Sequence, residues 1–201
     1  MNANIQIIAK EGWFGAIVLG ALFLVCVFFE WEVLGVIFLL AFVLWLFMFR
    51  NPERIAKNQP KAFHSPVDGI VRHIDILEKN ICVQIYTRFF DVGVVRAPSD
   101  ILHASLKKKG GLTLCFANSD KKRMLNTSFS LAWKDKQDFC LELFPEFFRN
   151  SRIYADSNLA SGERLGFMKK GLTKIYLPKS AELKVSIGDK VSACNSVIGE
   201  L

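Results

Sequence analysis

The sequence predicts a mostly β protein, in which a two-helix transmembrane hairpin precedes a β-rich domain with a barrel- or sandwich-like form. Two observations lead to this fold class. The first 50 residues hold two long apolar runs without charges, whereas the rest of the 201-residue chain consists of short alternating or β-branched stretches. We therefore expect a membrane hairpin over 1–50, a basic linker over 51–61 and a β-rich domain over 62–201.

The hairpin follows from the runs Trp13–Phe29 and Val33–Phe49, which are separated only by the acidic segment 30–32. Each run has 17 residues and would extend about 25 Å as a helix, at the short end of what spans a bilayer. The alternative is a cleaved signal peptide followed by a buried helix. Such a peptide needs a basic start and a small-residue cleavage site, but Lys10 stands beside an acid and no such site separates the runs.

The charges that flank the runs predict the orientation of the hairpin. Basic side chains crowd the exit of the second run, whereas the turn holds two glutamates, and Lys and Arg stay on the cytoplasmic side. We expect a multi-pass protein of the cell inner membrane whose C-terminal domain is cytoplasmic. The basic residues on this flank are Arg50, Arg54, Lys57 and Lys61.

The cysteines agree with a reducing compartment. There are five, an odd number, and they show neither CxxC nor CxxH spacing, so we expect neither a disulfide framework nor a metal site. They are Cys26, Cys82, Cys115, Cys140 and Cys194.

Net charge points to a partner. The formal charge is +7, and +6 of it lies beyond residue 61, mainly in the clusters 107–109, 121–123 and 169–170. A basic domain close to a cytoplasmic leaflet is attracted to anionic phospholipid headgroups, so we expect membrane phospholipids as partners. Basic residues do not alternate with aromatic ones as in a nucleic-acid-binding module, so we expect no nucleic acid.

The β-rich domain is predicted from many short stretches at close spacing, bounded by Asp-Gly, Gly-Gly and Gly-Asp turns. The terminal pieces "SPVDGIV" and "VSIGDKVSACNSVIGEL" are typical of barrel-sandwich domains. The predicted strands are 69–76, 81–86, 91–95, 101–106, 112–117, 127–133, 138–144, 174–177, 183–187 and 191–201.

Four stretches in order carry a resemblance to a known family: "FMFRNPER", "SPVDGIV", "RFFDVGVVRAPSD" and "SGERLGFMKKGLTKIYLP". Together with the hairpin, the chain resembles the short, membrane-anchored (archaeal-like) phosphatidylserine decarboxylases over nearly its full length. The resemblance implies a β-rich catalytic domain at the cytoplasmic membrane face, which converts phosphatidylserine into phosphatidylethanolamine and CO2.

The resemblance also implies a cofactor made by the chain itself. Members of the family cut their backbone at a Gly-Ser bond, and the new chain begins with a pyruvoyl ketone that forms a Schiff base with the substrate amine. An aspartate and a histidine assist proton transfers. Asp68 matches the aspartate, and Arg96 matches an arginine that we take as a candidate for substrate binding.

This chain departs from the family pattern at two positions. The histidine is replaced by Gly93, and the cleavage pair is Gly171-Leu172. Leucine has no hydroxyl that could attack the preceding carbonyl, which argues against a pyruvoyl group. Thr173 offers an alternative, because its hydroxyl could attack the Leu172 carbonyl and leave a 2-oxobutanoyl group. Its stiff side chain and the missing histidine count against it.

Several residues leave alternatives open. His64 could face a site together with Asp68, since a histidine beside a carboxylate can be poised near neutral pH. Each of the three histidines, His64, His73 and His103, is better explained as a surface or strand-filling residue. The Asp-Gly pair at Asp68 is also common turn chemistry.

The sequence therefore predicts a phosphatidylserine decarboxylase-related membrane protein of phospholipid biosynthesis with incomplete catalytic residues. One alternative is an active lyase that uses a non-standard ketone. Another is a non-catalytic lipid-binding or assembly partner of phospholipid-synthesis enzymes, which could itself form homo-oligomers. A third, an export adaptor with an outward-facing domain, conflicts with the flanking charges. A zinc peptidase is set aside, because no HxH spacing occurs.

Overall fold

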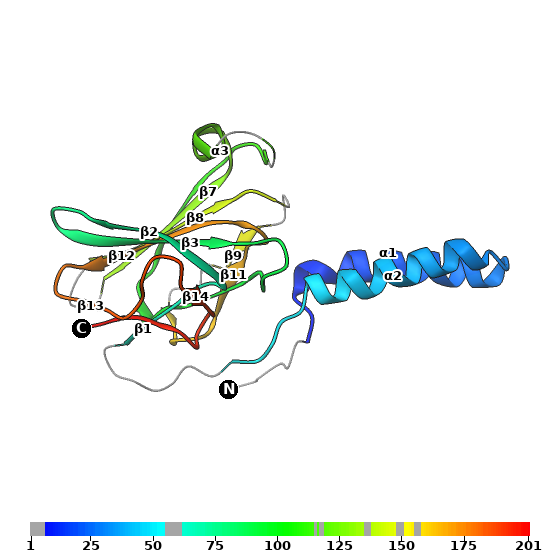
Figure 1. Ribbon diagram of the computed structural model, residues 1–201, viewed down its shortest axis with the longest axis horizontal. Coiled ribbons are helices and arrows are strands. Elements are labelled where there is room, and N and C mark those ends of the chain that lie inside the picture. The colour runs from blue at the N-terminus through cyan, green and yellow to red at the C-terminus, as the bar shows by residue number, and fades with distance from the viewer. Residues whose placement is uncertain are drawn as a thin grey trace. The chain divides into compact units, whose positions relative to one another are not determined.

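The computed structural model describes residues 7–54, 62–114, 116, 119–134, 138–147, 151–154 and 158–201. Most of the predicted linker, residues 55–61, lies outside this set, as does Cys115. By its internal contacts the chain divides into two units, Met1–Glu53 and Arg54–Leu201. Each unit is described by itself (Figure 1).

The first unit is a pair of apolar helices. The 3-10 turn η1 (Lys10–Gly12) leads into α1 (Trp13–Phe28), and α2 (Glu32–Met48) follows after a short turn. The helices approach closely, because an added Cβ at Gly15 would lie 2.2 Å from the Trp45 ring. The Trp45 indole donates a 2.8 Å hydrogen bond to the Gly12 carbonyl, so it joins the two ends of the hairpin.

Length and composition favour membrane association of this unit. The segment Lys10–Phe28 has 19 residues and a mean hydropathy of 2.1, which suits a membrane span, and only 17% of it is buried. A core helix of a soluble protein would be mostly buried. The second helix, with 17 residues, is slightly shorter. Large apolar side chains such as Phe14 and Phe28 are about 80% exposed, which water would disfavour.

The second unit is built on a seven-stranded antiparallel sheet with the strand order β14-β2-β3-β12-β8-β7-β6 (Figure 1). A short helix, α3 (Ser119–Leu125), interrupts the connection from β6 to β7. The strands are β2 (Gly69–Ile76), β3 (Asn80–Thr87), β6 (Ser105–Lys109), β7 (Ser128–Lys134), β8 (Asp138–Pro145), β12 (Gly171–Pro178) and β14 (Lys190–Val191).

Three smaller sheets complete the unit, and all of their pairings are antiparallel. Their orders are β1-β15-β13, β4-β11-β9 and β10-β5. The strands are β1 (Ala62–His64), β4 (Val94–Arg96), β5 (Ile101–Leu102), β9 (Arg152–Ile153), β10 (Asn158–Leu159), β11 (Arg164–Phe167), β13 (Glu182–Leu183) and β15 (Val197–Glu200).

One hydrophobic core joins the large sheet to the small ones. On the long strands β3, β7, β8 and β12 every second side chain enters it, because successive side chains of a strand point to opposite faces. Residues from the large sheet, such as Ile85 and Ile175, belong to the same buried cluster as Val95, Leu165 and Ile198 from the small sheets. The inner face of the seven-stranded sheet is therefore the core face.

The structure confirms the mostly β class with an apolar helix pair at the N-terminus. The long strands β2, β3, β7 and β8 lie within one residue of their predicted bounds. The stretch 112–117 differs, because its described residues hold only an isolated bridge between Leu112 and Asn126. Strand β12 also begins three residues before the predicted 174–177, so the cleavage pair lies in a strand.

Candidate functional site

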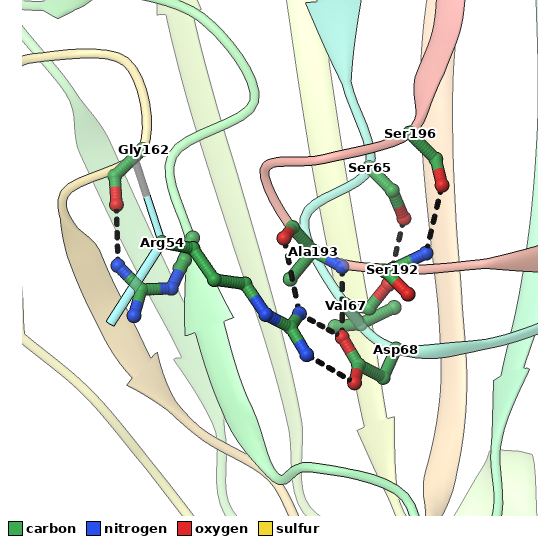
Figure 2. A network of polar contacts seen from close by, with 9 residues as sticks. Arg54, Ser65, Val67, Asp68, Gly162, Ser192, Ala193 and Ser196 are labelled. Atoms are coloured by element: carbon green, nitrogen blue, oxygen red, sulfur yellow. Dashed lines mark hydrogen bonds and ion pairs between the residues drawn. The ribbon is translucent and has the colours of Figure 1, made fainter. Parts of the chain in front are cut away.

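The "SPVDG" turn holds its aspartate in a closed network (Figure 2). Arg54 donates from both terminal nitrogens to the two carboxylate oxygens of Asp68, with Nη2–Oδ2 at 2.8 Å. The backbone N–H of Ala193 donates to Asp68 Oδ1 at 2.8 Å, and Arg54 also donates to the Ala193 carbonyl at 3.0 Å. The Ser65 hydroxyl closes the turn on the Val67 carbonyl at 2.7 Å.

This network ties three distant parts of the domain together. The side chains of Arg54 and Asp68 are only 13% and 14% exposed, so the ion pair is largely shielded from water. The pKa of Arg54 is raised, because its hydrogen bonds to Asp68 outweigh the opposing effect of burial. Both carboxylate oxygens of Asp68 are already engaged, which makes the residue a structural anchor between the linker side and the C-terminal segment.

Arg96, the candidate for substrate binding, lies against the same turn. Its backbone N–H donates to the Pro66 carbonyl at 2.8 Å, and its Nη1 donates to the Gly162 carbonyl at 2.9 Å. The side chain is buried, and burial lowers the pKa of Arg96. Burial also raises the pKa of the neighbouring Cys194 thiol, against the charges of Arg96 and Arg54.

The space beside Gly93, where the resemblance implies a histidine, is filled by other atoms. A Cβ at Gly93 would lie 2.8 Å from the Phe167 ring and 3.3 Å from the Met168 carbonyl oxygen. The Gly93 carbonyl accepts a 2.7 Å hydrogen bond from the Met168 backbone N–H. The segment before the cleavage pair is thus packed directly onto Gly93, in the space that a side chain there would need.

Leu172 and Thr173 lie in β12, the middle strand of the seven-stranded sheet, which pairs with β3 on one side and β8 on the other. Thr173 is opposite Ile85 and Leu143, both in the buried core, and is itself wholly buried. Leu172 is opposite Tyr86 and points to the other face. The two candidate cleavage residues therefore present their side chains to opposite faces of the sheet.

A pocket of about 250 Å³ opens on the outer face, and Leu172 lines it. Tyr86 and Lys122, also in its wall, both donate to Glu146 Oε2, at 3.2 and 3.1 Å. Burial, with help from the Glu146 carboxylate, raises the pKa of Tyr86 to about 12. At neutral pH the pocket wall thus presents a protonated phenol beside a Lys–Glu ion pair.

One lysine of the predicted basic surface is buried in the structure. Lys169 is wholly buried, and its Nζ donates a 2.8 Å hydrogen bond to the Asp91 carbonyl. Asp91 in turn accepts hydrogen bonds from Arg88. Burial disfavours ionisation of Asp91, but the contacts with Arg88 outweigh it and lower its pKa. The cluster 169–170 therefore offers a headgroup only one accessible lysine.

The histidines do not gather around Asp68. His64 is buried in β1, and its Nδ1 has no hydrogen-bond partner among the described residues. No hydrogen bond or ion pair between His64 and Asp68 is found in that part of the chain. His73 lines the outer pocket, and His103 is exposed with φ at +52°. Across the described ranges, no group of three or more His, Cys, Asp and Glu could hold a metal ion.

Sequence reasoning missed the partners that define this region. Arg54 was assigned to the linker as a membrane-flanking charge, yet it binds Asp68. Its place in the first family-like motif, "FMFRNPER", was the available signal. No comparable signal marked Lys169 or Phe167, because Phe167 is opposite Val94 and Lys169 donates to the Asp91 carbonyl, both far away in the sequence.

Comparison with known proteins gives a consistent answer. Residues 40–199 match the family model for phosphatidylserine decarboxylase. Phosphatidylserine decarboxylase proenzymes are similar in Geotalea uraniireducens (27% identical, covering 96% of each chain) and Desulfotalea psychrophila (28%, covering 86% of each). Another from Aromatoleum aromaticum is 29% identical and covers 97% of this chain and 96% of its own. No solved structure matches. The family model matches most of the chain, and the chain therefore belongs to the phosphatidylserine decarboxylase family.

Proposed function

We propose that this chain is a membrane protein of phospholipid biosynthesis that stays uncut, makes no ketone, and acts by binding lipid or by assembling with phospholipid-synthesis enzymes. Its family membership supports the pathway. The lyase activity of the relatives requires processing of a precursor, as their name, proenzyme, indicates. Whether this chain is processed is therefore the decisive property.

One observation carries the proposal: the only hydroxyl between residues 169 and 175 faces the hydrophobic core, on the opposite side of the sheet from the side chain at position 172. Between residues 169 and 175, Thr173 alone carries a hydroxyl. A serine at position 172 would face the outer pocket, whereas Thr173 faces the core between Ile85 and Leu143. A shift of one residue along a strand reverses the face. Thr173 therefore does not replace a serine at 172 without a change in the register of β12.

The surroundings support the same conclusion. Strand β12 is paired on both sides around residues 171–173, so its peptide groups are held in regular sheet geometry. The residue that matches the family aspartate is engaged with Arg54, and the histidine position is filled by the Phe167 ring. Neither group is arranged to move a proton at the Leu172–Thr173 bond.

The active-lyase alternative keeps one observation in its favour. The Thr173 hydroxyl is buried and has no hydrogen-bond partner among the described residues. A hydroxyl without a partner is destabilising in a core, and a role in cutting the chain would explain why it is there. This alternative predicts a 2-oxobutanoyl group at residue 173. The Thr173 oxygen attacks the Leu172 carbonyl to form an ester, elimination releases chain 1–172 as a carboxylate, and water hydrolyses the resulting imine to the ketone with release of ammonia.

Mass spectrometry of the purified full chain separates the two. We expect one uncut polypeptide of 22.7 kDa. The lyase alternative predicts two chains, 1–172 and 173–201, with the shorter one blocked to amino-terminal sequencing. The Aromatoleum aromaticum proenzyme, purified in the same way, is the positive control for processing. A blocked fragment that begins at residue 173, and that disappears in Thr173→Val, would overturn the proposal.

We further propose a two-pass arrangement in the inner membrane with the second unit in the cytoplasm. It is supported by the two apolar helices and by the basic residues that follow α2. Attachment of a membrane-impermeant reagent to single cysteines tests it. We expect the reagent to label Trp31→Cys from the periplasm, and to label Lys179→Cys only after lysis. Labelling of Lys179→Cys from the periplasm, and of Trp31→Cys only after lysis, would contradict this arrangement.

A further inference from the structure

Nearly all of the net charge of the chain lies in one stretch. Residues 101–134 contain seven Lys and Arg and one acid, Asp120, so their formal charge is 7 − 1 = +6, against +7 for the whole chain. This stretch consists of β5, β6, α3 and β7. The domain is therefore strongly basic at one place and close to neutral elsewhere.

Within this stretch, the connection over residues 110–127, here named the α3 excursion, is fastened at its base. The buried Asn126 side chain binds both backbone polar groups of Leu114, at 2.8 and 3.0 Å, and the Pro145 carbonyl at 3.2 Å. The Leu112 backbone N–H donates to the Leu125 carbonyl at 2.8 Å. The two ends of the excursion are thus held together, and Figure 1 shows α3 projecting beyond the strands.

The excursion exposes apolar side chains beyond this base. Phe116 is 99% exposed, Met124 72%, Leu112 58% and Leu125 49%. Four large apolar residues within 14 positions, all turned outward, differ from the scattered single exposures that are normal on protein surfaces. Two of them, Leu112 and Phe116, belong to the stretch from which the sequence predicts a strand at 112–117.

Lysines border this apolar group. Lys107, Lys108 and Lys109 are exposed on β6, an edge strand, and Lys121 is exposed on α3. The Lys109 ammonium reaches the Met124 carbonyl at 3.4 Å, which places this charge beside the apolar side chains. Lys108 lies over the Phe129 ring at 5.8 Å.

Edge protection and nucleic-acid binding each account for only part of this pattern. Lysines on an edge strand discourage pairing with another sheet, but they do not explain the exposed Phe116 and Met124. A nucleic acid would also bind lysines, but these apolar side chains include only one aromatic ring for stacking on bases. Apolar residues that enter the headgroup region, bordered by lysines that bind anionic headgroups, account for both features.

We propose that the α3 excursion docks onto an anionic lipid surface, with Phe116, Met124 and their apolar neighbours inserted and Lys107, Lys109 and Lys121 on the headgroups. The inference rests on the proposed membrane location of the chain, but not on whether the chain is cut. Only 13 residues (49–61) separate α2 from β1, so the membrane is always close to the domain. Docking would fix the domain on the surface instead of leaving it tethered only by this segment.

The test uses the full chain in lipid nanodiscs with a photo-reactive benzoylphenylalanine at position 116. The matched control carries the same group at Ile187, which is 63% exposed and lies outside the basic stretch. After irradiation, mass spectrometry measures lipid adducts on each chain. We expect at least about fivefold more lipid adduct at 116 than at 187 in phosphatidylglycerol discs, because one well-placed lysine contributes about that factor. In phosphatidylcholine discs the excess should fall.

Charge variants test the lysines. The variant Lys107→Gln/Lys109→Gln/Lys121→Gln should lose most of the excess adduct at 116 in phosphatidylglycerol discs. The variant Lys79→Gln/Lys179→Gln/Lys190→Gln removes the same charge from exposed positions elsewhere and should retain it. Added salt should weaken the adduct in the wild type more than in the first variant.

The possible failures are distinguishable. Equal adducts at 116 and 187, or adducts at 116 that are mainly to protein, would overturn the docking surface and leave the uncut state and the membrane location intact. Equal loss in both charge variants would also contradict it. A chain that does not enter the discs at all would overturn the proposed location and this surface together.

Discussion

The "SPVDG" turn and strand β12 are both family-like segments, yet they differ in what they retain. At the turn, Asp68 and the arginines are present, and each is held by several hydrogen bonds. Around β12, Gly93 lies under the Phe167 ring where the resemblance implies a histidine, and Leu172 stands where it implies the cleavage serine. The turn residues make contacts that the fold itself uses, whereas Gly93 and Leu172 stand at positions for which the resemblance implies a chemical use.

This contrast explains why a family-like sequence does not by itself indicate activity. Replacing Asp68 would leave the largely shielded guanidinium of Arg54 without its carboxylate, so folding alone is reason to keep Asp68. A histidine at position 93 or a serine at 172 has no comparable structural task here. Four predictions test the contrast, in order of decreasing effect.

The largest effect is expected at the ion pair. Asp68→Asn should lower the free energy of unfolding by about 3 kcal/mol, because Arg54 loses its charged partner in a shielded site. Denaturant unfolding of the full chain in detergent, followed by the intrinsic fluorescence of the tryptophans, measures the change. Glu78→Gln, at an exposed acid, is the control and should have little effect. A stability equal to wild type for Asp68→Asn would show that the turn does not depend on the pair.

A smaller loss is expected at Gly93, where the resemblance implies a histidine. Gly93→Ala should lower the free energy of unfolding by about 1–2 kcal/mol, because its Cβ would press on the Phe167 ring and the Met168 carbonyl. Gly110→Ala is the matched control, since a Cβ there would meet nothing within 4 Å. If both variants were equally stable, Gly93 would have space for a side chain, and the absence of the histidine would need another reason.

The outer pocket should respond to alkaline pH. The pKa of Tyr86 is raised to about 12 in the folded protein, against 10.0 ordinarily. The unfolded chain therefore releases this proton first, and the free energy of unfolding should fall as pH rises from about 10 to 12.

Comparison with Tyr86→Phe over the same pH range isolates this residue, because the remaining titrating groups are common to both proteins. In Glu146→Gln the phenol should titrate at lower pH by ultraviolet absorbance, since a neighbouring negative charge is removed. A Tyr86 phenol that titrates near 10 in the wild type would contradict this environment.

The smallest change is expected at Thr173. Thr173→Val removes a buried hydroxyl that has no partner in the described part of the chain, and it keeps the shape of the side chain. The free energy of unfolding should stay the same or rise by up to about 1 kcal/mol. Thr173→Ser keeps the hydroxyl and is the control. A clear loss of stability in Thr173→Val, without a loss in Thr173→Ser, would reveal a hydrogen bond from the Thr173 hydroxyl that stabilises β12.

Much of the fold could be predicted because its signals are local. The charge-free runs located the helices within one residue, and alternation located β2, β3, β7 and β8. The short strands β1, β9, β10 and β11 have two to four residues, too few for a periodic pattern. The stretch 112–117 also alternates, but Leu112 and Phe116 are exposed, so alternation there does not indicate a buried face.

The candidate site was less predictable because it depends on contacts between distant residues. The sequence identified Asp68, but turn chemistry and catalysis accounted for it equally well. Its ion-pair partner, Arg54, lies 14 residues earlier, and no local pattern links the two. The orientation of Thr173 was also open, since the cleavage pair was expected outside the predicted strand 174–177. Once β12 begins at Gly171, alternation determines which face Leu172 and Thr173 occupy.

The pairing of β1 with β15 has a consequence for biosynthesis. Ala62 is opposite Glu200, so β1 can pair only after β15 has been synthesised. During translation the domain cannot close until residues up to 200 have left the ribosome, whereas the apolar hairpin emerges first. The bilayer insertion that we propose for the hairpin can therefore be complete while β1 still lacks its partner strand, a period when chaperones protect such chains.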